Sequence, residues 1–204
     1  MEWYQWLALA SLAVCTGSLL FHFIRLIRLG NPVDYSDRLG SPASAMTYAF
    51  AGSMSPSKKE SAFLHLPTYT AGIFYHLGTF LSIFIFLAFL LSFTFEGWLV
   101  WAFSICLVIS GISGFGIFVK RIVKSQMRSL SNPDDYLSNL LVTMFHFFTV
   151  MAVLNPASLP VYFVAASLLL LYVPVGKLKH TLYFFAARYH LGFFYGWRGV
   201  WPPK

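Results

Sequence analysis

Charged side chains are scarce in this sequence, since Asp, Glu, Lys and Arg together make up 10% of its 204 residues. Soluble domains carry about 25% charged residues, so this chain has too little polar surface to cover a water-exposed globule. A composition that is 58% hydrophobic also excludes an intrinsically disordered chain. The class that remains is an all-α, multi-pass membrane protein.

Several motifs of soluble and membrane enzymes are also missing. The two cysteines, Cys15 and Cys106, lie inside apolar runs and form neither a CxxC motif nor a disulfide framework. The absence of an HxxxH set and of an HExxH sequence argues against a membrane di-iron desaturase and an intramembrane zinc protease. The sequence has no iron–sulfur, flavin or molybdenum motif. Any redox chemistry on a substrate would therefore belong to a partner subunit.

Apolar segments dominate what is present. A transmembrane helix needs roughly 20 apolar residues to cross a hydrocarbon layer of about 30 Å. The first segment has no positively charged start and is too long for a signal peptide, so we expect a retained span. The second and third are joined only by Glu96 and Gly97, which predicts a tight helical hairpin. The sequence predicts one domain, residues 1–204, with helices at about 3–29, 67–95, 97–119, 136–154 and 159–190.

Basic residues predict the orientation of these helices. All 14 lysines and arginines fall on one side of the five-helix arrangement: Arg25, Arg28, Arg38, Lys58, Lys59, Lys120, Arg121, Lys124, Arg128, Lys177, Lys179, Arg188, Arg198 and Lys204. The positive-inside rule then places the N-terminus outside and the C-terminus in the cytoplasm, with the protein in the cytoplasmic (inner) membrane. Trp3, Trp6, Trp98 and Trp101 would form an outer aromatic belt. The net charge of +7 is thus interpreted as a topology signal, and we expect no nucleic-acid partner.

Two histidines are predicted at the same membrane depth. His76 lies 19 residues from Phe95, and His180 lies 20 residues from Pro160. At 1.5 Å per residue, both are about 29 Å from the outer ends of their helices. Polar side chains at such depth are costly and mark functional sites. Two imidazoles at one level on neighbouring helices are what axial ligation of a b-type haem requires, so we predict that His76 and His180 bind the haem iron.

A second pair of histidines is matched in the same way. His65 lies 11 residues beyond His76, and His190 lies 10 residues beyond His180. These displacements are about 16 and 15 Å along a helix, which gives a second level at or beyond the cytoplasmic face. Pro67 favours a helix that begins after His65, which weakens this pair.

The remaining histidines leave alternatives open. His22 lies 19 residues from Trp3 and so shares the first level, where it can replace a ligand or bond a propionate or quinone. His146 lies nine residues from Asn155, about 14 Å deep, with no histidine at its level. It is either a further ligand or a buried histidine satisfied by a neighbouring hydroxyl or carbonyl group.

Two other patterns predict structural roles. Gly111, Gly114 and Gly116 lie in an apolar helix rather than after a strand, which indicates close helix packing. Asp134 and Asp135 follow Asn132-Pro133 and suit the N-terminus of a helix, where acidic side chains are favoured.

Three short strings resemble a known family. They are FYHLG at 74–78, SNPDDY at 131–136 and YVPVGKLKH at 172–180. These strings, with the predicted number and order of helices over most of the chain, resemble the membrane cytochrome b family of the respiratory nitrate reductase gamma subunit. The resemblance is closest to the cytochrome b subunits associated with dissimilatory sulfite reductase and heterodisulfide reductase.

This resemblance implies one or two b haems between the second and fifth helices, and a site for menaquinone or ubiquinone. It also implies a hetero-oligomeric complex in which electrons pass between quinone or quinol and a cytoplasmic iron–sulfur or other redox subunit. Under this interpretation Lys177, Lys179, Arg188 and Arg198 can pair with haem propionates. Two-haem members carry a further histidine near the position of Phe86, so the number of haems stays open.

A haem-free interpretation is the alternative. The chain would then be a membrane anchor, an interaction protein or a small transporter whose histidines are structural or relay protons. In either case its surface contacts membrane lipid. An electron-transfer subunit, rather than an enzyme that converts a substrate by itself, is the form of activity that we expect.

Overall fold

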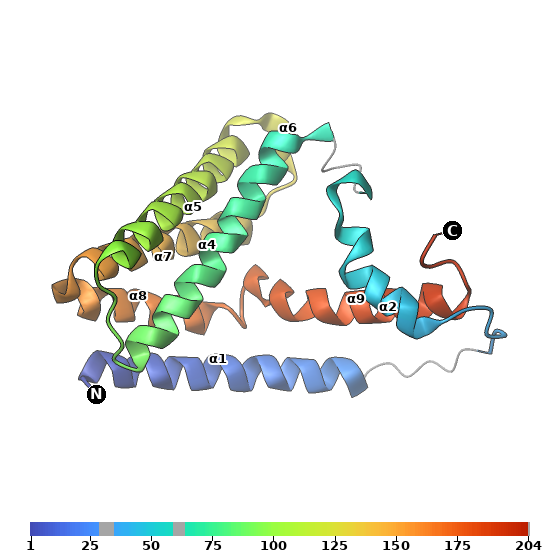
Figure 1. Ribbon diagram of the computed structural model, residues 1–204, viewed down its shortest axis with the longest axis horizontal. Helices are drawn as coiled ribbons and strands as arrows, with labels where there is room; N and C mark the ends of the chain where they lie inside the picture. The colour runs from blue at the N-terminus through green and yellow to red at the C-terminus, as the bar shows by residue number, and fades with distance from the viewer. Residues whose placement is uncertain (29–34, 59–63, 204) are drawn as a thin grey trace. The chain divides into compact units, whose positions relative to one another are not determined.

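The computed structural model describes residues 1–28, 35–58 and 64–203, and Figure 1 shows its helices. Three residues with predicted roles lie outside these ranges: Leu29 at the end of the first helix, and the basic residues Lys59 and Lys204. Within the described ranges all regular structure is helical and no strand occurs, which confirms the all-α class. The helices form two compact units, Met1–Ser18 with Pro67–Leu178, and Leu19–Leu66 with Lys179–Lys204, and each is described by itself.

The first unit contains most of the long apolar helices. Its elements are the N-terminal part of α1 (Trp3–Arg28), α4 (Leu66–Leu90), α5 (Trp98–Val123), α6 (Ser125–Ser129), α7 (Pro133–Leu154), η3 (Pro156–Ser158), α8 (Leu159–Tyr172) and η4 (Lys177–Lys179). Helices α1, α4, α5 and α7 are long and apolar enough to cross a membrane. A fifth span is added if Pro156–Tyr172 and Lys177–Trp197 count as one broken span. Four to five candidate spans agree with a multi-pass membrane protein.

The third helix ends at Val123 rather than residue 119 and the fourth begins at Pro133 rather than residue 136, and the second and fifth helices differ more from the prediction. The second helix ends at Leu90 instead of residue 95, because the chain turns at Ser92, which has a φ of 62°. The backbone N–H of Phe93 donates to the carbonyl of Ala88 at 2.9 Å and closes this turn. The predicted fifth helix, 159–190, is interrupted after Tyr172. Pro174 lies in the interruption, and a proline has no N–H with which to continue a helix.

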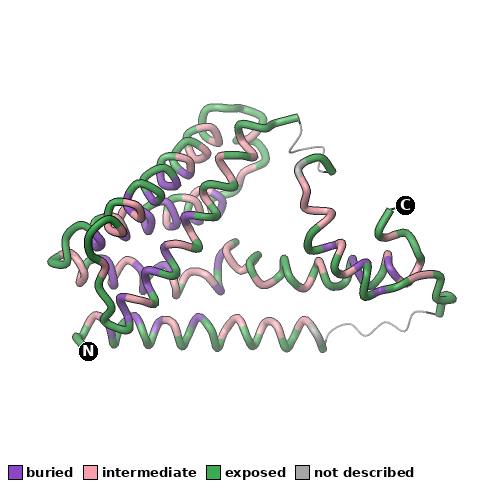
Figure 2. The backbone as a smooth tube through the Cα atoms, viewed as in Figure 1, coloured by how far each residue is buried: buried purple, intermediate pink, exposed green. Residues whose placement is uncertain are grey.

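Aromatic packing forms the core of the first unit. Phe145 of α7 stacks on Tyr162 of α8 with ring centroids 5.8 Å apart, and Tyr4 of α1 stacks on Phe163 at 5.4 Å. Buried positions recur along α4, α5, α7 and α8 (Figure 2). The side-chain amide of Gln5 donates to the carbonyl of Phe89 at 3.2 Å, which holds the start of α1 against the end of α4.

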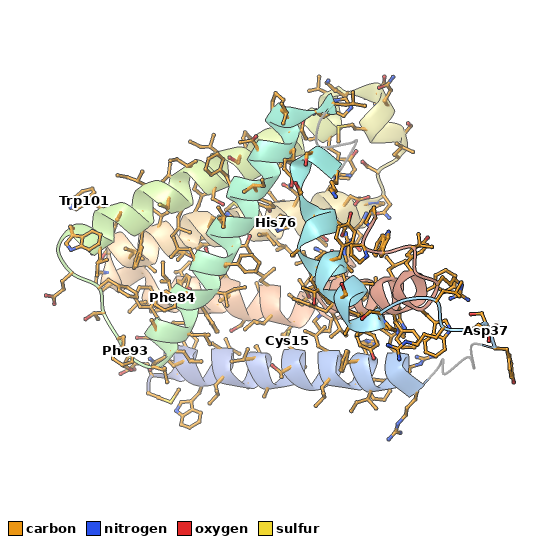
Figure 3. The ribbon with its side chains drawn as sticks, turned by 45° about the vertical axis from the view of Figure 1, so that its right-hand side comes forward. Cys15, Asp37, His76, Phe84, Phe93 and Trp101 are labelled. Atoms are coloured by element: carbon orange, nitrogen blue, oxygen red, sulfur yellow. The ribbon has the colours of Figure 1, made fainter. Side chains whose placement is uncertain are left out.

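Large apolar side chains also cover the outside of this unit, as a lipid-facing surface requires. Phe84 lies on α4, Trp101 lies near the start of α5, and Phe93 lies in the connection between these helices (Figure 3). All three are exposed. The other tryptophans of the predicted belt, Trp3 and Trp6 on α1 and Trp98 on α5, are exposed as well. An exposed tryptophan at the end of an apolar helix is typical of a membrane interface.

The second unit is built on close contact between α2 (Pro42–Phe50) and α9 (His180–Trp197). A Cβ atom added to Gly192 would lie 2.6 Å from the Cα atom of Met46, and one added to Gly196 would lie 2.7 Å from the Cα atom of Pro42. The two glycines form a GxxxG pattern that lets two helix backbones approach. This unit also contains η1 (Gly52–Met54), η2 (Pro56–Lys58) and the C-terminal part of α1.

Helix α2 lies between the first two predicted helices, at 3–29 and 67–95, where the sequence predicted no helix. Its start is defined by Ser41, whose hydroxyl accepts a hydrogen bond from the backbone N–H of Ser44 at 3.4 Å, and by Pro42 in the first turn. Both are common helix-start signals. The helix is only nine residues long, too short to be stable without packing on α9.

Candidate functional site

A buried histidine connects three helices of the first unit. His146 of α7 has no exposed surface. Its Nε2 atom lies 3.1 Å from the hydroxyl of Thr79 on α4, and its Nδ1 atom lies 3.2 Å from the hydroxyl of Ser110 on α5. Both ring nitrogens are therefore hydrogen-bonded to side chains of neighbouring helices.

The backbone carbonyl of Tyr75 indicates how the protons are arranged in this cluster. The Thr79 hydroxyl donates its proton to that carbonyl at 2.8 Å. The hydroxyl oxygen of Thr79 can then only accept a hydrogen bond from the Nε2–H group of His146. Nδ1 is then an acceptor for the hydroxyl of Ser110, whose single proton can go either to Nδ1 at 3.2 Å or to the Tyr75 carbonyl at 3.3 Å. A neutral imidazole with its proton on Nε2 satisfies each of these groups.

The side chain of Tyr75 packs on the same imidazole. The two rings meet edge to face, with centroids 5.2 Å apart. The Tyr75 hydroxyl donates to the carbonyl of Asn139 at 2.9 Å and lies 3.2 Å from the hydroxyl of Thr143. These contacts tie the middle of α4 to α7, with the aromatic ring over the buried histidine.

Two glycines make room for this cluster. A Cβ atom at Gly78 would overlap the hydroxyl of Ser110, and one at Gly114 would overlap the ring of Tyr75. Gly111 is similarly close to Phe147, so the predicted packing role of the helix-three glycines holds for Gly111 and Gly114. It does not hold for Gly116, which has no atom within 4 Å of an added Cβ.

His146 thus has the hydroxyl partners that its structural interpretation requires. Neither ring nitrogen is available without breaking a hydrogen bond to Thr79 or Ser110. The cluster joins α4, α5 and α7 through polar contacts within otherwise apolar spans. Such interhelical hydrogen bonds stabilise helix association in a membrane.

His76 has different surroundings, although it follows Tyr75 directly. It is exposed and lies in the middle of α4 (Figure 3). The nearby Phe74, Leu77 and Phe80 are also exposed, with 47%, 58% and 66% of their surface accessible. An ionisable side chain on the exposed side of an apolar helix marks a candidate functional residue. Its exposure also leaves the ring accessible to a planar cofactor, which fits the donor chemistry of a b haem.

The predicted partner, His180, is the first residue of α9 and is exposed. It ends the 172–180 string, which forms the break between α8 and α9. Pro174 and Gly176 are buried in this break, and the hydroxyls of Tyr172 and Ser138 lie 3.0 Å apart. The string therefore has a defined turn structure in which His180 starts a new helix.

Asp135 anchors the same turn to α7. Its carboxylate accepts from the ammonium group of Lys177 and lies 3.6 Å from Nη1 of Arg121. It also forms a capping box with Asn132, with both hydrogen bonds at 3.0 Å. The predicted role of Asp135 at the helix N-terminus is confirmed, whereas its ion pairs were not predicted. The scarcity of acidic residues, seven in the whole sequence, was the available signal that Asp135 has a basic partner.

The other predicted histidine ligands belong, like His180, to the second unit. His22 is half-buried in α1, and His65 is exposed at the residue before α4 begins. His190 is exposed on α9, edge to face with Tyr189 at a centroid distance of 5.6 Å. Within residues 1–28, 35–58 and 64–203, no three His, Cys, Asp or Glu side chains are grouped to hold a metal ion. Both proposed haem pairs stay predictions.

The basic residues predicted to support propionates have protein contacts of their own. Lys177 pairs with Asp135, as described above. Nη1 of Arg188 donates to the hydroxyl of Ser53 at 3.1 Å and so links α9 to η1. The guanidinium of Arg198 lies 3.7 Å from the ring centroid of Phe194, and Lys179 is half-buried. Their roles toward a haem stay predictions.

Comparison with known proteins finds no matching family model, no matching curated protein and no matching solved structure. The resemblance to the nitrate reductase gamma-subunit family rests on residues 74–78, 131–136 and 172–180. In the structure these strings form the middle of α4, the start of α7 and the break between α8 and α9.

Proposed function

We propose that this chain is a membrane cytochrome b that anchors a larger oxidoreductase. His76 and His180 would bind the iron of a b haem, which supplies one-electron transfer when it is bound. Electrons would pass between membrane menaquinone or ubiquinone and a cytoplasmic iron–sulfur or other redox subunit. The orientation expected from the basic residues, with the N-terminus outside, is part of the same proposal.

The observation that carries the proposal is the exposed imidazole of His76 on an apolar span. A haem would cover this exposed ring and coordinate it. His146, by contrast, is fully buried. His180 is added because it lies at the same predicted depth in the sequence and is also exposed.

The surroundings of His180 support its role as a ligand. An axial ligand must be held in one position by residues around it. The turn that precedes His180 is fixed by the contact between Lys177 and Asp135 and by the hydroxyl pair of Tyr172 and Ser138. These contacts order the turn up to Lys177, three residues before His180.

We propose one haem per chain. Phe86, at the position of the further histidine in two-haem relatives of the resembled family, is buried in the core of the first unit. Its ring lies 5.9 Å from that of Phe163, and a phenyl group cannot bind iron. His65 and His190 are the alternative ligands for a second haem, so the ratio of haem to protein distinguishes the two cases.

A haem assay on purified protein tests this proposal. We expect a pyridine haemochrome spectrum of haem b from the full chain, and its loss from His76→Ala and from His180→Ala. His146→Leu is the matched control, because that histidine has its hydrogen bonds inside the protein, and we expect it to retain haem. A wild-type protein without haem b would favour the haem-free anchor, and haem retained in His76→Ala would refute the ligand assignment.

A further inference from the structure

A groove of about 630 Å³ lies where α5, α6 and α7 meet in the first unit. Residues from all three helices and from the connection before α7 line it, among them Phe118, Arg128, Ser131, Tyr136, Leu137 and Leu140. Its size is in the range of small-molecule sites in proteins. None of these side chains has a part in the proposed haem site.

The rim of the groove is cationic. Arg128 of α6 is exposed, and no carboxylate in the described part of the chain pairs with its guanidinium. Ser131 beside it accepts a hydrogen bond from Nη1 of Arg121 at 2.9 Å. The Nε atom of Arg121 is buried without a hydrogen-bond partner in residues 1–28, 35–58 and 64–203. The rim therefore offers the guanidinium of Arg128 to a bound group.

The floor of the groove is apolar. Phe118 and Tyr136 meet edge to face with centroids 6.1 Å apart. Leu137 and Leu140, on the membrane-spanning helix α7, are 45% and 40% exposed. A cationic rim above exposed leucines and aromatic rings matches a ligand with a charged end and a hydrocarbon end.

The charge around the groove selects an anion. Residues 120–128 contain four basic side chains and no acidic one. The two acids that follow are engaged within the protein, because Asp135 pairs with Lys177 and Arg121, and Asp134 accepts from the hydroxyl of Ser138 at 3.4 Å. The charge at Arg128 is thus left for a ligand.

We propose that this groove is a binding site for an anionic phospholipid. The phosphate group would pair with the guanidinium of Arg128 beside Ser131, because arginine recognises phosphate through charge-assisted hydrogen bonds. One acyl chain would lie along Phe118, Leu137 and Leu140. A free phosphate ion would leave these apolar side chains uncovered, so the lipid is the ligand that uses both parts of the groove.

Lipid titration of the purified full chain tests the site. The protein is placed in bilayer discs of phosphatidylcholine with increasing dioleoyl phosphatidylglycerol, and bound lipid is counted by native mass spectrometry. We expect one retained phosphatidylglycerol per chain, and about tenfold weaker retention in Arg128→Gln. Lys124→Gln is the matched control. It also removes one positive charge, but Lys124 lies four residues before Arg128 in the sequence and does not line the groove. If the lipid were held only by general attraction to positive charge, the two variants would lose phosphatidylglycerol equally.

Three results would overturn the proposal. Equal losses in Arg128→Gln and Lys124→Gln would indicate diffuse surface attraction. Displacement of the lipid by millimolar glycerol phosphate would indicate a site for a soluble anion. Equal retention of phosphatidylcholine and phosphatidylglycerol by the wild-type protein would exclude recognition of the charge, and this comparison needs no variant that must fold.

Discussion

Replacing His146 by leucine separates a structural histidine from a ligand. The change removes the hydrogen bonds to Thr79 and Ser110, which join α7 to α4 and α5, and keeps an apolar side chain of similar size in a fully buried position. We expect a less stable protein that still binds haem. We expect the same change at the exposed His76 to abolish haem binding and to lower the stability of the protein less.

The magnitude follows from the contacts that are lost. Interhelical hydrogen bonds in membranes contribute about 0.6 kcal/mol each, so two of them give about 1.2 kcal/mol. A swap of side chains of similar volume in a packed core adds up to about 1.5 kcal/mol. We therefore expect His146→Leu to lower the free energy of unfolding by about 1–3 kcal/mol. His76→Leu, at an exposed position, should lower it by less than His146→Leu does in the haem-free protein.

Both variants are measured in mixed micelles of a mild detergent and SDS, with helix content followed by circular dichroism as the SDS fraction rises. Protein made in cells that cannot synthesise haem gives the stability of the haem-free chain, and protein from normal cells gives the haem content. Equal stabilities for His146→Leu and wild type would refute the hydrogen-bonded cluster. A large loss for His76→Leu in haem-free protein would show that this side chain stabilises the fold.

Three further predictions concern packing and charge. Gly114→Ala should destabilise the first unit by about 1–3 kcal/mol because its Cβ overlaps the ring of Tyr75, whereas Gly116→Ala on the same helix should be neutral or slightly stabilising in the same SDS titration. Gly192→Ala should push α9 away from α2, so amide hydrogen exchange in residues 42–50 should speed up; unchanged exchange would contradict the close contact. Asp135→Asn should cost about 1–2 kcal/mol and remove most of the salt dependence of stability at this end of α7; unchanged salt dependence would count against the ion pairs.

The class of fold could be predicted from the sequence because the length of an apolar run is a local property. Helices α1, α4, α5 and α7 each begin within three residues of the predicted position. The end of α4 differs because Ser92 takes a positive φ, a conformation that is not apparent from an apolar run. The break between α8 and α9 was also not predicted, because the apolar run continues through it, although Pro174 marks its position.

Helix α2 could not be predicted from its own residues. It is short, and nothing in its composition separates it from a loop except Ser41 and Pro42. Its stability depends on Gly192 and Gly196 of α9, which are about 150 residues away in the sequence. A contact between segments so distant is a property of the tertiary fold, and the GxxxG pattern in α9 was the one signal that could have pointed to it.

The candidate site illustrates what depth alone can and cannot indicate. Counting residues along helices assigns a level to every histidine, and by this measure His146 has no partner, because only other histidines were compared with it. In the folded chain its partners are hydroxyls, as its structural interpretation expected, but Thr79 and Ser110 are residue types too common in spans to be singled out from the sequence. Depth also cannot distinguish the inward side of a helix from the outward side. His76 and His146 lie on neighbouring spans, and only burial shows that one imidazole is enclosed by the protein while the other is exposed. An exposed polar ring on an apolar helix can be reached by a bound cofactor, which is why the exposed histidine, and not the buried one, is the stronger candidate for a cofactor ligand.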